Sequence, residues 1–187
     1  MKADPTYVAK LASIKNKNKR KAWMRGDWDV VSGGILDDIW DEAIHVISPF
    51  RIPPSWKVDR SFDWGSSKPF WVGWWAESDG TAMTTPEGKH IHYPRGTVFL
   101  IAEWYGWNGT PNAGLHMLAS KIASGIKERE EIIRKNLLSP GMTIRPGPAD
   151  ASIFDIENGN CIADDMGVAG VRWEKADKSP GSRVQGW

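Results

Sequence analysis

Residues 56–69 read Trp-Lys-Val-Asp-Arg-Ser-Phe-Asp-Trp-Gly-Ser-Ser-Lys-Pro. The first half of this stretch predicts an extended strand that ends at Asp63, and Gly65 then allows a sharp turn with close backbone approach to a ligand. A carboxylate at the end of a strand suits a hard cation such as Mg²⁺, which takes oxygen ligands from one or two carboxylates and from phosphates. Because Asp followed closely by Gly is also common in ordinary turns, these residues alone leave both interpretations open.

Two further strands are expected after Pro69. Residues 70–76 form an apolar run of strand length, residues 77–96 are rich in turn residues, and residues 97–105 are β-branched and aromatic. Three successive strands of this kind predict an antiparallel meander. His90 and His92 alternate within the insert, as metal ligands or as two rings on one face of a hairpin; the hairpin is favoured because no Cys or further His stands at ligand spacing.

A long helix is predicted next, with Thr110 as its N-cap and Pro111 in its first turn. Apolar residues that repeat at helical spacing would place one face of this helix on the sheet; they are Leu115, Leu118, Ile122, Ile126 and Ile133. Residues 141–145 predict a short fourth strand that stops at Pro146-Gly-Pro148, followed by Asp150. Residues 161–166 and 171–175 then predict a short helix and a last strand.

The composition sets limits on the class of protein. The 187 residues suffice for one domain with a preceding segment, and the 12 tryptophans are read mainly as packing residues. The net charge of +1 provides no global attraction for nucleic acid, so any basic contact surface must be local. A single cysteine, Cys161, excludes an internal disulfide, and no apolar window approaches the length of a membrane span. We therefore expect a soluble intracellular protein.

The N-terminal segment carries a basic run, Lys15 to Lys21, that could hold phosphates but fits a solvated helix face better. Residues 26–55 are rich in Gly, Asp and Pro and predict an irregular linker, with an edge strand possible near residues 45–50. No Gly-x-x-x-x-Gly-Lys-Ser/Thr loop occurs, so no ATP site of that type is expected.

Several stretches resemble, in order and spacing, the nuclease domain of tailed-phage large terminase subunits. They are Arg25-Gly-Asp-Trp28, Val31-Ser-Gly-Gly34, His45-Val-Ile-Ser-Pro-Phe50, Phe62-Asp-Trp-Gly-Ser-Ser-Lys-Pro69, Ile101-Ala-Glu-Trp-Tyr-Gly106, Pro146-Gly-Pro-Ala-Asp150 and Lys178-Ser-Pro-Gly-Ser-Arg183. The resemblance covers most of the chain. It implies an α/β fold with a ribonuclease-H-like mixed five-stranded sheet, three antiparallel strands followed by parallel strands, flanked by helices. Residues 56–187 would form the nuclease domain, and residues 1–55 the tail of an ATPase domain and a linker.

The resemblance also implies a two-metal site for Mg²⁺ or Mn²⁺ at Asp63 and Asp150. In such a sheet the fourth strand lies beside the first and parallel to it, and neighbouring strands are about 4.8 Å apart, so carboxylates at matching strand ends can share metal ions. Asp150 could instead cap a helix. Glu103 ends the third strand, two positions from the first, and is expected to be an outer ligand or a surface carboxylate.

The function implied is endonucleolytic cleavage of concatemeric double-stranded DNA during viral genome packaging, in the host cytoplasm. The partners implied are the small terminase subunit and the portal protein. Lys68, Lys178 and Arg183 would contact DNA phosphates. The resemblance also implies a further acidic residue, on a helix that would lie beyond residue 187. A weakly active domain, or a non-catalytic prophage remnant or DNA-gripping module, is therefore the alternative.

Overall fold

The computed structural model describes residues 5–15, 20, 23–24, 39–85, 87–157 and 159–180. The chain forms two compact units, Met1–Ser48 and Pro49–Trp187. The first unit contains helices α1 (Pro5–Ala12) and α3 (Glu42–His45). The edge strand considered near residues 45–50 is absent from the structure, because Asp41 accepts a hydrogen bond from the backbone N–H of Ala43 and so starts a helical turn just before it.

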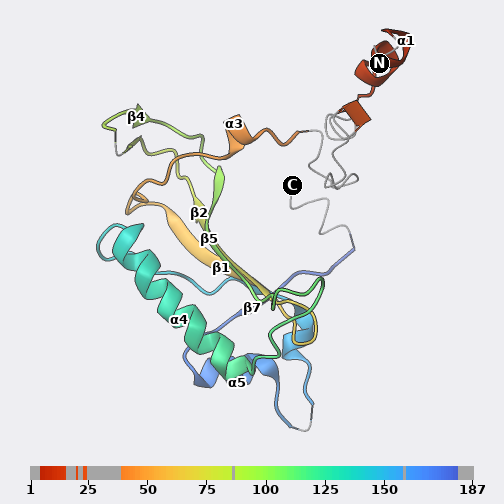
Figure 1. Ribbon diagram of the computed structural model, residues 1–187. Helices are drawn as coiled ribbons and strands as arrows, with labels where there is room; N and C mark the ends of the chain where they lie inside the picture. The colour runs from red at the N-terminus through yellow and green to blue at the C-terminus, as the bar shows by residue number, and fades with distance from the viewer. Residues whose placement is uncertain are drawn as a thin grey trace. The chain divides into compact units, whose positions relative to one another are not determined.

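The second unit is a mixed α/β structure built on a five-stranded sheet in the order β5-β2-β1-β6-β7 (Figure 1). The strands are β1 (Lys57–Asp63), β2 (Trp71–Glu77), β5 (Val98–Tyr105), β6 (Pro148–Ala149) and β7 (Glu174–Lys175). The β1–β2 and β2–β5 pairs are antiparallel, while the β1–β6 and β6–β7 pairs are parallel. The predicted mixed sheet, with three antiparallel strands followed by parallel ones, is confirmed.

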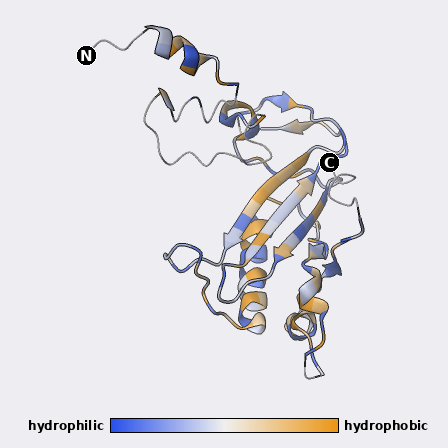
Figure 2. Ribbon diagram, turned by 90° about the vertical axis from the view of Figure 1, so that its right-hand side faces the viewer, coloured by the Kyte–Doolittle hydropathy of each residue, from blue (hydrophilic) through white to orange (hydrophobic). Residues whose placement is uncertain are grey.

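The strands form because their side chains alternate between a buried face and an open one. In β1, Val58, Arg60 and Phe62 are buried, whereas Asp59 and Ser61 face the other side. Figure 2 shows hydrophobic and hydrophilic segments following one another along the strands. This alternation fixes the side of the sheet on which each residue of β1 lies.

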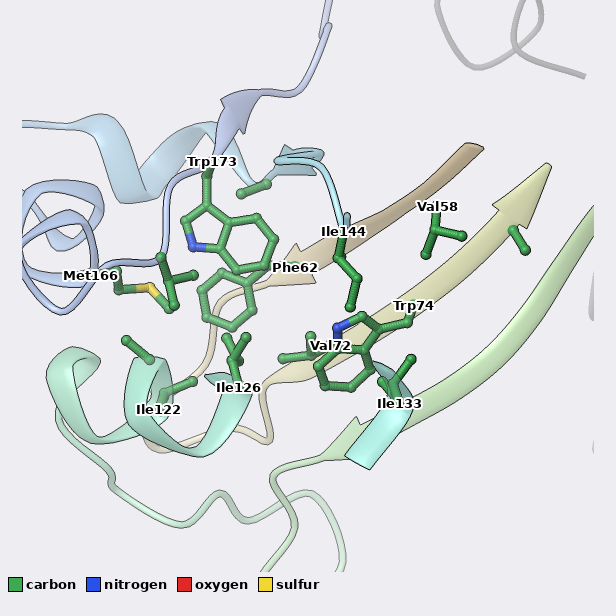
Figure 3. Packing of buried hydrophobic residues seen from close by; sticks show 14 of the residues in the cluster. Val58, Phe62, Val72, Trp74, Ile122, Ile126, Ile133, Ile144, Met166 and Trp173 are labelled. Atoms are coloured by element: carbon green, nitrogen blue, oxygen red, sulfur yellow. The ribbon is translucent and has the colours of Figure 1, made fainter. Parts of the chain in front are cut away.

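Helix α4 (Ala119–Asn136) covers the buried face. Figure 3 shows Phe62, Val72 and Trp74 of the sheet directed toward the helix, where Ile122, Ile126 and Ile133 are also buried. Packing of this apolar stripe on the sheet forms the core of the unit. The predicted covering helix is therefore confirmed over its second half.

The predicted start of that helix at Thr110-Pro111 is wrong. These residues form a turn in which Ala113 donates its backbone N–H to the carbonyl of Thr110, and Asn112 has a φ of 58° that a right-handed helix cannot contain. Leu115 and Leu118, expected on the buried face, are 40% and 70% exposed. Threonine followed by proline suits a turn as well as a helix start, and here the turn is formed.

The fourth strand, predicted at residues 141–145, lies later in the chain, at Pro148–Ala149. Arg145 makes only an isolated parallel bridge to Asp59, and the strand itself is β6. The backbone N–H of Arg145 donates to the carbonyl of Val58, and that of Asp150 donates to the carbonyl of Phe62. The five residue steps from 145 to 150 therefore run beside only four residue steps of β1, from 58 to 62. The extra residue lies around Gly147, where a Cβ would overlap the carbonyl oxygen of Arg60.

The remaining elements agree with the sequence-based expectations. Strands β3 (Met83–Thr84) and β4 (His90–Ile91) form a separate two-stranded hairpin that carries the exposed His90, whereas His92 follows outside the strand. The hairpin is confirmed, and the shared face of the two rings stays a prediction. A short 3₁₀-helix, η1 (Ala151–Phe154), and helix α5 (Ile162–Val168) connect β6 to β7. No helix in the described part of the chain is both long and apolar enough to cross a bilayer.

Candidate functional site

The turn that follows β1 is held in a fixed conformation by two glycines. A Cβ at Gly65 would overlap the carbonyl oxygen of Lys68, so only glycine fits there. Gly114 lies against the same turn and donates its backbone N–H to the carbonyl of Ser67 at 2.8 Å. Asp63 stands at the start of this turn; it is exposed, and its carboxylate has no hydrogen bond or ion pair to any other described residue. The turn therefore presents a free carboxylate from a rigid support.

Asp150 lies beside Asp63 at the same edge of the sheet. Ala149 pairs with Phe62 in parallel register, and the backbone N–H of Asp150 donates to the carbonyl of Phe62 at 3.0 Å. Both Phe62 and Ala149 are buried on the α4 side, so the residue after each starts toward the opposite side. With a strand spacing of about 4.8 Å, the two aspartates leave neighbouring strands close to each other, as the sequence predicted.

The carboxylate of Asp150 has two partners of its own. Its Oδ1 accepts a hydrogen bond from the backbone N–H of Ser152 at 2.9 Å and forms an ion pair with Nζ of Lys178 at 2.8 Å. The hydrogen bond from Lys178, and next the one from Ser152, hold the pKa of Asp150 below its usual value. The helix-capping alternative is thus also realised, because Asp150 is the N-cap of η1.

Glu103 is not brought to the two aspartates. It pairs with Gly73, which pairs with Ser61, so it lies two strands across and two residues along from Asp63, about 12 Å by standard strand dimensions. Its carboxylate accepts a hydrogen bond from Nε1 of Trp71 at 2.9 Å. The ring of Trp71 lies over Gly73, where a Cβ would overlap it. Glu103 is therefore engaged by the tryptophan at a distance from the site.

Of the three basic residues predicted to contact DNA, two are described. Lys68 is exposed in the turn after β1 and makes no ion pair with another described residue. Lys178 is at the site, but as the partner of Asp150. Arg183 lies outside the described residues.

Asp63 and Asp150 are the residues that could hold one hard cation. Two carboxylates at adjacent strand ends are the oxygen ligands that Mg²⁺ uses together with water and phosphate. Within the described ranges, however, no group of three or more His, Cys, Asp or Glu residues could hold a metal ion. Ligands for a second ion are thus not apparent among those residues.

A buried ion pair beneath the site was not predicted. Nη1 of Arg60 lies 2.7 Å from Oε1 of Glu130 on α4, and both side chains are 6% exposed. Nη2 of Arg60 also donates to the carbonyl of Arg172, just before β7, at 2.8 Å. Burial lowers the pKa of Arg60, and Glu130 opposes this shift. The pair fastens the helix and the segment before β7 to the strand that ends at Asp63.

A signal for this pair exists in the sequence. Arg60 alternates in phase with Val58 and Phe62, and Glu130 follows Ile126 by four residues on the apolar stripe of the helix. Two opposite charges, each on a face expected to be buried, predict a partnership, because an unpaired charge is rarely left in a core.

Comparison with known proteins gives no match: no family model, no curated protein and no solved structure resembles this chain at a significant level.

Proposed function

We propose that the second unit is a divalent-metal-dependent DNA endonuclease domain with a ribonuclease-H-like fold. The observation that carries the proposal is the parallel register of Phe62 and Ala149, which puts Asp63 and Asp150 at matching ends of neighbouring strands. Two acidic residues separated by 87 positions in the sequence meet at one edge of the sheet only because of this register.

The topology supports the proposed fold. Counted along the chain, the strands of the large sheet stand in the order third, second, first, fourth, fifth. The connection from the third strand to the fourth contains α4, which packs on one face of the sheet. This is the arrangement that the resemblance to terminase nuclease domains implies.

In this proposal Asp63 and Asp150 hold Mg²⁺ or Mn²⁺ together. When bound, such a cation lowers the pKa of a water molecule and offsets charge on the leaving oxygen of a phosphodiester. The rigid turn at Gly65 keeps Asp63 in place, and the hydrogen bond from Asp150 to Phe62 sets the separation of the two main chains. The exposed Lys68 is positioned to contact a phosphate of double-stranded DNA without reading its sequence. The two-ion arrangement stays a prediction, because no group of three or more His, Cys, Asp or Glu residues in the described part of the chain could hold a metal ion.

The biological role that accompanies this activity is cleavage of viral DNA during packaging, with the small terminase subunit and the portal protein as partners in the host cytoplasm. This part of the proposal depends entirely on the sequence motifs that resemble those of terminases.

The second candidate is a DNA-gripping module without catalysis. It is favoured by the position of Glu103, which is held by Trp71 away from the two aspartates, and by the ion pair between Lys178 and Asp150. A site with only two carboxylates, one of them neutralised by a lysine, could fail to retain metal at physiological concentrations.

A plasmid cleavage assay distinguishes the two candidates. The chain is incubated with supercoiled plasmid and Mn²⁺ or Mg²⁺, beside Asp63→Asn, Asp150→Asn and, as a matched control, Asp164→Asn on the exposed side of α5. We expect nicking by the wild type and by the control, and no nicking by the two site variants. Retarded plasmid without cleavage would support the gripping module. Cleavage that survives Asp63→Asn would refute the proposed site.

A further inference from the structure

The ion pair between Lys178 and Asp150 is built into the backbone. The N–H of Ala176 donates to the carbonyl of Ala149 at 3.0 Å, which fastens the segment after β7 beside the end of β6. One residue before Lys178, Asp177 accepts a hydrogen bond from the backbone N–H of Ser179 at 2.8 Å and so forms a tight turn around the lysine. These two bonds deliver the ammonium group to Asp150.

The contact uses Oδ1, one of the two oxygens of the carboxylate at which we propose that the cation binds. Oδ1 of Asp150 already accepts from Ser152 and from Lys178. A lysine ammonium is a compact point charge, and it lies 2.8 Å from an oxygen that Mg²⁺ would approach to about 2.0–2.1 Å. Like charges at such separations repel strongly. The lysine and the cation therefore cannot both occupy this side of Asp150.

The lysine is also free to leave. Its side chain is 62% exposed, and Asp150 is its one ion-pair partner among the described residues. Exposed pairs of this kind are weak and are screened by salt. Among the described residues, the neighbouring Asp63 has no comparable cation, so the two carboxylates of the site differ in how readily each accepts metal.

We propose that Lys178 is a tethered counter-ion that occupies Asp150 in the metal-free protein and competes with the divalent cation for it. This inference rests on the proposed function, since it assumes that the cation binds at Asp63 and Asp150. Lys178 then sets the metal concentration at which the site fills, instead of acting only as a phosphate clamp.

The test is a calorimetric titration of Mn²⁺ into the full chain and its variants, without DNA. Lys178→Met removes the competitor and should tighten Mn²⁺ binding about two- to fivefold, the range that corresponds to an exposed ion pair. Lys178→Glu puts a carboxylate where the ammonium was and should bind Mn²⁺ more tightly than Lys178→Met. The matched control is Lys175→Met, which removes an exposed lysine three residues away and should leave the affinity unchanged.

Tryptophan fluorescence and circular dichroism establish that each variant is folded. If Lys178→Met binds Mn²⁺ no more tightly than the wild type, while Asp63→Asn abolishes binding, the counter-ion role is overturned and the proposed function stands. If none of these chains, Lys178→Glu included, binds Mn²⁺, both proposals are overturned.

Discussion

Two ion pairs of nearly equal length in this protein differ in how deeply their side chains are buried. Arg60 and Glu130 are 2.7 Å apart with both side chains 6% exposed, while Lys178 and Asp150 are 2.8 Å apart with side chains 62% and 31% exposed. In the first pair, removal of one partner leaves a charge in the core; in the second, water replaces it. We infer that the pair between Arg60 and Glu130 maintains the fold, whereas Lys178 can be replaced by another cation as the partner of Asp150.

The largest effect is expected at Glu130. Glu130→Gln leaves the buried Arg60 without its counter-charge and should lower the free energy of unfolding by about 3–5 kcal/mol. The adjacent Glu131, whose side chain is 76% exposed and pairs with Arg134, provides the matched control; Glu131→Gln should cost less than about 1 kcal/mol. Urea denaturation of both variants measures the difference. Equal destabilisation would show that burial does not separate the two classes of pair.

Replacement of both Arg60 and Glu130 tests whether the charges or the hydrogen bonds of the buried pair dominate its contribution to stability. Arg60→Met combined with Glu130→Leu removes both charges, and well-packed apolar residues often substitute for a buried ion pair without loss. We expect the double variant to be less destabilised than Glu130→Gln, although the carbonyl of Arg172 loses its donor and both Trp74 and Arg134 lose Glu130 as a partner. A double variant at least as unstable as the single one would indicate that the hydrogen bonds, and not the charges, dominate.

Gly147 lies close to members of both ion pairs, because it contacts the carbonyl of Arg60 and lies three residues before Asp150. Gly147→Ala should overpack this contact and reduce the free energy of unfolding by about 1–3 kcal/mol. Gly167 in α5 is the control: no atom lies within 4 Å of the position of its Cβ, so Gly167→Ala should stabilise the helix, by up to about 1 kcal/mol. Thermal denaturation should show shifts of opposite sign, and a neutral Gly147→Ala would mean that β6 can move away from β1.

The smallest effect concerns the exposed pair and pH. The pKa of Asp150 is depressed in the folded protein, so its ionised form stabilises the fold above the unfolded pKa of about 4, and that contribution is lost as the pH falls through the folded pKa. Asp150→Asn keeps the helix cap but removes the charge. It should be less stable than the wild type by at most about 1 kcal/mol at pH 7 and equally stable near pH 2. A stability difference between the wild type and Asp150→Asn that is larger at pH 2 than at pH 7 would contradict the predicted direction of the pH dependence.

Much of the sheet could be predicted from the sequence. The alternation in β1 defines its buried face, the apolar run of residues 70–76 indicates a largely buried β2, and three successive strands are enough to expect an antiparallel meander. Local periodicity carries this information because it reflects which face each residue buries. The parallel fourth strand, and with it the shared edge of Asp63 and Asp150, was instead implied by the resemblance to a ribonuclease-H-like sheet.

Other features depend on contacts between distant segments and left no local signal. The start of α4 is delayed because Gly114 and His116 donate their backbone N–H groups to the turn after β1. The pairing of Lys178 with Asp150 follows from the hydrogen bond between Ala176 and Ala149. No residue spacing in the sequence predicts that hydrogen bond. Only the buried pair could have been recognised, from the phases of Arg60 and Glu130.

If Asp63 and Asp150 bind one divalent cation together, as we propose, the number of Mn²⁺ ions bound per chain should depend on both carboxylates. Electron paramagnetic resonance of Mn²⁺ at increasing protein concentration should show one bound ion per wild-type or Asp164→Asn chain. It should show none bound at the same concentrations for either Asp63→Asn or Asp150→Asn. Unchanged binding in both site variants would contradict the claim.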